Sequence, residues 1–219
     1  MHDTPQQALV HFGREMLARG LTTGSGGNLS VCERSRDRVW ITPSGIPYMA
    51  LTPADMVSCD GRGAVAAGER RPSSELDFHL ALYRHRPDIG AVVHTHSVFA
   101  TTLACMHREI LPVHYLVGFA GPKVPLAPYA TFGTPALARS ITDTIGDHNA
   151  VLLANHGLVA VGATLAKAFD VAEEIELVAR IYYQTLVAGE PRLLSDTQMA
   201  EVLEKFKHYG QTAPPAGEE

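Results

Sequence analysis

Cysteine is scarce in this chain of 219 residues, and the three that occur, Cys32, Cys59 and Cys105, lie far apart. No two of them form a Cys-X-X-Cys pair, so their spacing matches neither a zinc knuckle nor a disulfide framework. We expect three reduced thiols that ligate no metal.

Long hydrophobic runs and an excess of positive charge are also missing. No stretch approaches the roughly 18 uninterrupted apolar residues of a membrane span, and residues 1–7 lack the basic start and apolar core of a secretory signal. We therefore expect no membrane association and a cytoplasmic location. The formal net charge is -5, which argues against nucleic-acid binding because that binding depends on Lys and Arg neutralising phosphates.

What the chain does have is the composition of a globular domain, with 46% hydrophobic and 19% charged residues. Its length suits one domain, which we predict over residues 1–210, with a disordered tail over 211–219.

Hydrophobic periodicity and turn signals predict helices mixed with strand pairs. The predicted helices cover residues 5–19, 72–85, 98–106, 135–145, 165–187 and 196–207. The predicted strands cover residues 29–32, 39–41, 56–59, 92–96, 113–117, 124–126, 151–155 and 158–161. This pattern favours an α/β layered single domain whose central sheet is mixed and largely antiparallel and is flanked by helices.

Three histidines stand at the ends of predicted strands. His94 and His96 close one apolar run, and His156 follows another. Side chains at i and i+2 of a strand point to the same face, so His94 and His96 can reach one point in space. Imidazole suits zinc and neighbouring transition metals, and a catalytic zinc takes three protein ligands. The arrangement predicts a metal site, although a single strand histidine is more often structural.

A carboxylate is available to complete such a site. Glu75 lies in the first turn of a predicted helix, where it is a candidate fourth ligand, a base, or both. The alternative is a helix-start residue stabilised by the helix dipole. His79 shares the face of Glu75 four residues later and is a less favoured alternative ligand.

Three glycine- and serine-rich segments are typical of anion sites. Their candidate residues are Ser25, Gly27 and Asn28 in the first segment, Ser44 and Gly45 in the second, and Ser73 and Ser74 at a helix start. Backbone N–H groups in such loops and at helix N-termini bind phosphate. Each segment alone is more often a loop or a helix cap. Neither a Walker-type lysine nor GxGxxG spacing is present, so we expect no nucleotide cofactor.

Taken in order along the chain, these segments resemble the class II aldolase/adducin family, and most closely its L-fuculose-1-phosphate aldolase branch. The resemblance covers nearly the whole chain and is carried by residues 24–31, 41–48, 72–75, 93–96, 114–115, 127–134, 155–158 and 202–210.

The resemblance implies a zinc ion held by His94, His96, His156 and Glu75, with Co²⁺ or Mn²⁺ as substitutes. It also implies phosphate binding by the seven loop residues named above. Two tyrosines, Tyr115 and Tyr209, would act in proton transfer. The alternative is that each tyrosine is simply a core or interface residue, which is the usual role of a tyrosine. Family members are cyclic homotetramers with active sites at subunit interfaces, so both tyrosines would come from a neighbouring subunit.

The implied activity is reversible cleavage of a ketose 1-phosphate to dihydroxyacetone phosphate and an aldehyde. The substrate would be a small phosphorylated sugar, either L-fuculose 1-phosphate or a 5-deoxyribulose or 5-methylthioribulose 1-phosphate. Thr95, Asn155 and residues 118–123 depart from the pattern expected of the branch, and the last segment is a candidate for shaping the aldehyde pocket.

Other functions fit the same fold. A sugar-phosphate epimerase, dehydratase or decarboxylase would reuse the metal, but residues 132–134 and the segment around Tyr209 favour the aldolase. An adducin-like scaffold without activity would have no need of the four metal ligands. A zinc hydrolase in which Glu75 activates water would have no need of the phosphate loops.

Overall fold

The structure, a computed structural model, describes residues 4–65 and 70–208. Within these residues seven strands form one sheet in the order β3-β2-β1-β4-β7-β6-β5. Their bounds are β1 (Asn28–Glu33), β2 (Arg38–Ile41), β3 (Val57–Cys59), β4 (Ala91–Thr95), β5 (Leu126–Ala127), β6 (Ala150–Leu153) and β7 (Gly157–Gly162). Only β5 and β6 pair in parallel, and the other neighbours are antiparallel. The predicted mixed, largely antiparallel sheet is confirmed.

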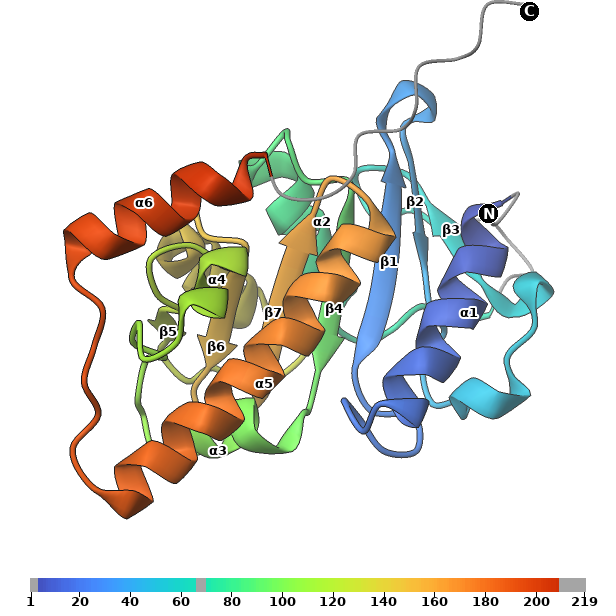
Figure 1. Cartoon of the computed structure of the whole chain (residues 1–219). Helices are drawn as coiled ribbons and strands as arrows, with labels where there is room; N and C mark the ends of the chain where they lie inside the picture. The colour runs from blue at the N-terminus through green and yellow to red at the C-terminus, as the bar shows by residue number, and fades with distance from the viewer. Residues whose placement is uncertain (1–3, 66–69, 209–219) are drawn as a thin grey trace, which may run out of the picture.

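Helices cover both faces of this sheet. The α-helices are α1 (Pro5–Ala18), α2 (Leu76–His85), α3 (Val98–Cys105), α4 (Pro135–Ile145), α5 (Leu165–Ala188) and α6 (Asp196–Phe206). Figure 1 shows α5 lying across one face, with α1 beside it at the β1 side of the sheet. Short 3₁₀ helices occur as η1 (Arg34–Arg36), η2 (Tyr48–Ala50), η3 (Pro53–Asp55) and η4 (Tyr115–Phe119).

The core consists of two apolar clusters, one on each face of the sheet. One cluster packs the sheet against α1, α3 and α5, and the other packs it against α2 and α4. Within β4, Ala91 and Val93 belong to the first cluster and Val92 to the second. This alternation follows from the two-residue period of a strand, and it confirms the layered architecture.

Two predicted strands differ from the structure in type or position, and a third, predicted over 151–155, ends early at Leu153. Residues 113–117 were predicted as a strand, but Tyr115–Phe119 forms the 3₁₀ helix η4. The His114 side chain accepts a hydrogen bond from the Leu116 N–H and thereby favours a turn. The strand predicted over 124–126 is shifted to Leu126–Ala127, and Val124 makes only an isolated bridge to Ile110.

No helix in the described part of the chain is both long and apolar enough to span a membrane. The predicted tail, residues 211–219, lies outside the described residues, and its disorder stays a prediction.

The register of the central strands brings three segments to one end of the sheet. At the start of β1, Asn28 pairs with His94 near the end of β4. Thr95 pairs in turn with Leu158 of β7, just beyond the turn that joins β6 to β7. Residues that precede β1, end β4 and form the β6–β7 turn therefore meet in space.

Candidate active site

The three predicted histidines converge at this end of the sheet. The two Nε2 atoms of His94 and His96 are 3.1 Å apart, and one ring nitrogen from each of His94, His96 and His156 lies within 4.8 Å of the others. His94 and His96 reach one point because they occupy positions i and i+2, and His156 joins them from the β6–β7 turn.

Glu75 lies against this cluster. Its Oε2 is 3.3 Å from His94 Nε2, and its Oε1 is 3.4 Å from His156 Nε2. Glu75 occupies the N-cap position of α2, yet its side chain makes no capping hydrogen bond. The carboxylate is directed to the histidines and does not serve as a helix cap.

The donor atoms fit a divalent metal ion. Glu75 Oε1 is buried and has no hydrogen-bond partner among the described residues. His94 Nδ1 donates to the carbonyl of Leu158 at 2.9 Å, so its Nε2 lone pair faces the cluster. Ligands held at about 2.0–2.2 Å around a tetrahedral ion are separated by about 3.3–3.6 Å. The separations of 3.1, 3.3 and 3.4 Å for the pairs His94–His96, His94–Glu75 and His156–Glu75 are close to this range.

Burial sets the protonation of these groups. It lowers the pKa of His94 well below its ordinary value and also lowers the pKa values of His96 and His156. Neutral imidazoles keep the lone pairs that a metal requires. Burial raises the pKa of the Glu75 carboxyl, whereas the hydrogen bond from Asn28 and the electrostatic interaction with His156 act in the opposite direction.

His79, weighed as an alternative ligand, is held elsewhere. Its Nε2 donates to Asn28 Oδ1 at 2.5 Å, and its Nδ1 lies 2.6 Å from Ser30 Oγ. Complete burial lowers the pKa of His79 to about 3, so the ring is neutral. Both nitrogens are engaged in hydrogen bonds and neither faces the histidine cluster.

One cavity of about 330 Å³ combines the anion loops with the metal cluster. Backbone hydrogen bonds hold two of these loops together, from Ser44 N to Arg71 O and from Ser73 N to Thr42 O. All seven predicted phosphate residues line the cavity, together with Glu75, His96 and His156 of the cluster; the full lining is Ser25, Gly26, Gly27, Asn28, Pro43, Ser44, Gly45, Ser73, Ser74, Glu75, His96, Phe132 and His156.

Gly27 allows the first loop to pack directly on β4. Its φ is +68°, and a Cβ at this position would collide with the carbonyl oxygen of His94. We expect Gly27→Ala to lower the free energy of unfolding by about 2–4 kcal/mol, from backbone strain plus overpacking. Gly24→Ala is the matched control because Gly24 has a φ of +62° but open space around it, so it should cost only about 1 kcal/mol. Equal losses in urea denaturation would show that the contact with His94 is unimportant.

Of the two predicted tyrosines, Tyr115 does not line this cavity. Tyr115 begins η4, is 51% exposed and stacks on Phe206 at a ring separation of 6.3 Å. Tyr209 lies outside the described residues. The functions predicted for both tyrosines stay predictions.

Asn155, noted as a departure in the sequence, has a structural explanation. It adopts a φ of +55° in the β6–β7 turn, a conformation that Asn tolerates better than most residues. Its Oδ1 accepts a hydrogen bond from His107 Nε2 at 2.7 Å. The residue thus shapes the turn that places His156.

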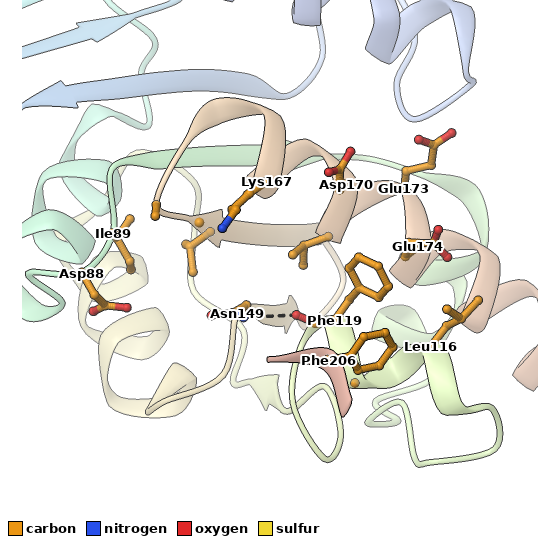
Figure 2. Close-up of a pocket in the computed structure, with 15 residues that line it drawn as sticks. Asp88, Ile89, Leu116, Phe119, Asn149, Lys167, Asp170, Glu173, Glu174 and Phe206 are labelled. Atoms are coloured by element: carbon orange, nitrogen blue, oxygen red, sulfur yellow. Dashed lines mark hydrogen bonds between the residues drawn. The ribbon is translucent and has the colours of Figure 1, made fainter. Parts of the chain in front are cut away.

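A second cavity, of about 690 Å³, is larger but carries none of the predicted site residues. Figure 2 shows the carboxylates of Asp170, Glu173 and Glu174 on one side of it and the rings of Phe119 and Phe206 on the other. Gly118 and Phe119, from the segment expected to shape an aldehyde pocket, line this cavity within the single chain. No histidine lines it, so size alone does not identify the reactive site.

Sequence reasoning missed two residues next to the site. Ser30 and Tyr83 hydrogen-bond to each other at 2.6 Å, and Ser30 also contacts His79. Their spacing in the sequence could have indicated these residues. Ser30 follows Asn28 by two positions in a strand, and Tyr83 follows His79 by four positions in a helix, so each shares a face with a residue already considered.

The chain is similar in sequence and structure to known aldolases. Residues 7–183 match the Class II Aldolase and Adducin N-terminal domain family. The chain is 50% identical over 206 residues to 5-deoxy-D-ribulose 1-phosphate aldolase of Bacillus thuringiensis serovar kurstaki, covering 94% of this chain and 97% of that protein. It is 44% identical to 5-methylthioribulose-1-phosphate/5-deoxyribulose-1-phosphate aldolase of Rhodospirillum rubrum, with 96% of each covered. The solved structure of an L-fuculose 1-phosphate aldolase superposes with a TM-score of 0.91 at 42% identity, covering 94% and 98% of the two chains.

Proposed function

The chain belongs to the class II aldolase and adducin N-terminal domain family, and from this premise we propose that it is a metal-dependent aldolase. The reaction is the reversible cleavage of a ketose 1-phosphate to dihydroxyacetone phosphate and an aldehyde. One cavity carries the proposal: the anion loops and the candidate metal ligands line the same 330 Å³ space. A zinc hydrolase would have no need of these loops.

His94, His96, His156 and Glu75 would hold the ion, with zinc favoured by three imidazoles and one carboxylate. When bound, the ion would supply Lewis-acid stabilisation of the negative charge that develops as the C3–C4 bond breaks.

Glu75 is the proton carrier in this proposal. Once bound substrate takes its place among the ligands, Glu75 would donate a proton to C3 in the cleavage direction and remove it in the condensation direction. Its Oε1 is the suitable atom because it has no hydrogen-bond partner among the described residues, whereas Oε2 accepts from Asn28 at 2.8 Å. The pKa of this carboxyl is raised by burial, which favours proton acceptance.

The serine- and glycine-rich loops would bind the C1 phosphate. Ser44 and Ser73 can present hydroxyl donors and Gly45 its backbone N–H group. The backbone N–H groups of Ser44 and Ser73 are already bonded to the carbonyls of Arg71 and Thr42, and these bonds hold the two loops in place. The Asn28 side chain already contacts Glu75 and His79, and its backbone pairs with His94 in the sheet. Its second amide hydrogen would therefore serve the phosphate. Fixing the phosphate converts remote binding energy into orientation of the reacting bond.

In a homotetramer, a neighbouring subunit could supply the tyrosines for proton transfer. In this proposal Tyr115 and Tyr209 of a neighbouring subunit handle the proton on the C4 oxygen. Tyr115 is half exposed and lies outside the cavity of its own chain, as this assignment requires.

Release of dihydroxyacetone phosphate tests the function directly. We expect release from 5-deoxyribulose, 5-methylthioribulose or L-fuculose 1-phosphate, with L-rhamnulose and L-ribulose 1-phosphates as comparisons. A chelator should abolish release, and Zn²⁺ should restore it, because the four ligands would then be reoccupied.

Other outcomes would redirect the proposal. If no ketose 1-phosphate released dihydroxyacetone phosphate, an epimerase, dehydratase or decarboxylase would replace the aldolase. Release that persisted at full rate after metal content fell below one-hundredth per chain would contradict a metal-dependent mechanism.

A further inference from the structure

A line of buried hydrogen bonds runs from the Glu75 carboxylate into the core between β1 and α2. Asn28 Nδ2 donates to Glu75 Oε2 at 2.8 Å, and Asn28 Oδ1 is 2.5 Å from His79 Nε2. The line continues from His79 Nδ1 to Ser30 Oγ at 2.6 Å, and from Ser30 Oγ to Tyr83 O–H at 2.6 Å. Each of the five side chains is buried. We call these five residues the Glu75 chain.

The secondary structure builds this arrangement. Asn28 and Ser30 lie two positions apart on β1 and share a face. Glu75, His79 and Tyr83 lie four positions apart along α2 and share a stripe. The strand residues interleave with the helix residues, so the contacts alternate between the two elements.

Only one set of proton positions satisfies every contact when Glu75 is ionised and His79 is neutral, as its burial requires. A carboxylate only accepts, so the amide nitrogen of Asn28 faces it and Oδ1 faces His79. His79 must then carry its proton on Nε2, which leaves Nδ1 to accept from the Ser30 hydroxyl. Ser30 Oγ in turn accepts from Tyr83. All four hydrogen bonds therefore donate in the direction of Glu75.

We propose that His79, Ser30 and Tyr83 are positioning residues that fix the Asn28 amide and thereby hold Glu75 Oε2, leaving Oε1 for proton transfer. This inference rests on the proposed function of Glu75. None of the three residues lines the candidate cavity, so they act through Asn28. Hydrogen bonds donated in one direction polarise and strengthen one another. Without His79 as donor, the Asn28 amide can rotate by half a turn and present its oxygen to the carboxylate.

The linear order of the Glu75 chain gives a specific kinetic test. Tyr83→Phe removes the far end, and Ser30→Ala breaks the middle. We expect kcat to fall about threefold in Tyr83→Phe and about tenfold in Ser30→Ala, with KM within twofold of the wild type and metal content unchanged. The double variant should match Ser30→Ala alone, since Tyr83 is already disconnected. Tyr182→Phe is the matched control, because Tyr182 is also buried but lies on α5.

Several results would overturn the inference. If the two losses multiply in the double variant, the residues act as independent packing positions. If Ser30→Ala loses metal in proportion to activity, the Glu75 chain supports metal binding only. An effect of Tyr182→Phe equal to that of Tyr83→Phe would show a general response to a lost buried hydroxyl.

A second readout does not depend on activity. Nitrogen NMR of the imidazole rings in metal-free protein should show His79 protonated on Nε2, and Ser30→Ala should shift the Nδ1 resonance. An Nδ1-protonated His79 in the wild type would overturn the inference whatever the activity. A wild type that cleaves no ketose 1-phosphate would contradict the proposed function, whereas an active wild type with kinetically normal variants would contradict this inference.

Discussion

Replacing His94 with alanine is expected to abolish metal binding and to lower aldolase turnover by at least about a thousandfold. His94 is fully buried, its Nδ1 is tethered to the Leu158 carbonyl, and its Nε2 lies between His96 and Glu75. The measurement is metal per chain, by atomic absorption, alongside dihydroxyacetone phosphate release.

His85→Ala is the control for this variant. His85 is an exposed histidine in the last turn of α2, so its loss should change neither metal content nor turnover. If His94→Ala retained one ion per chain, the assignment of His94 as a ligand would be wrong. If it lost the ion but kept its turnover, the metal would have no part in the reaction.

Replacing Glu75 with glutamine is expected to slow proton exchange at C3 of dihydroxyacetone phosphate by about 10²–10⁴-fold. The amide cannot accept and return the proton, but its oxygen can still accept the hydrogen bond from Asn28 Nδ2. The phosphate loops remain unchanged, so the affinity for dihydroxyacetone phosphate should stay within about threefold. Exchange is followed by proton NMR in deuterated water, and affinity by competitive inhibition.

Asp77→Asn provides the same chemical change two residues away. Asp77 lies in the first turn of α2 and is exposed, so exchange should continue at the wild-type rate. Wild-type exchange in Glu75→Gln would exclude Glu75 as the base. A large loss of phosphate affinity would instead indicate that the substitution distorts the loop at Ser73.

The convergence of the histidines was predictable because it follows from strand geometry. His94 and His96 share a face by the two-residue period. The structure places His94 in β4 and His96 directly after its last residue, Thr95, one position beyond the end of the strand. The predicted strand leading to His156 ends at Leu153, earlier than expected. His156 reaches the cluster from a turn, which the apolar run before it could not show.

The location of Tyr115 and the local structure around it were harder to predict. Residues 113–117 have the β-branched and aromatic content of a strand, but the His114 side chain caps a 3₁₀ turn there. Local hydrogen bonding by one side chain outweighed the propensity of its neighbours.

The role of His79 shows a different limit. Its spacing from Glu75 is readable from the sequence, and it suggested a possible metal ligand. In the structure the ring points to Asn28 and Ser30, because β1 packs against α2 at this position. The partner of a helical histidine depends on how the helix packs against its neighbours. The helical period of the sequence gives no information about that packing.

The order of the strands has a consequence for association between copies. The long strands β1 and β7 lie inside the sheet, while its two edges are formed by β3, with three residues, and β5, with two. Isolated bridges at Cys59–Val65 and Ile110–Val124 lie beside these edges. Exposed edge strands are templates for uncontrolled sheet extension, and short edges suppress it. With such short edges, the sheet of one molecule is not expected to extend into the sheet of the next.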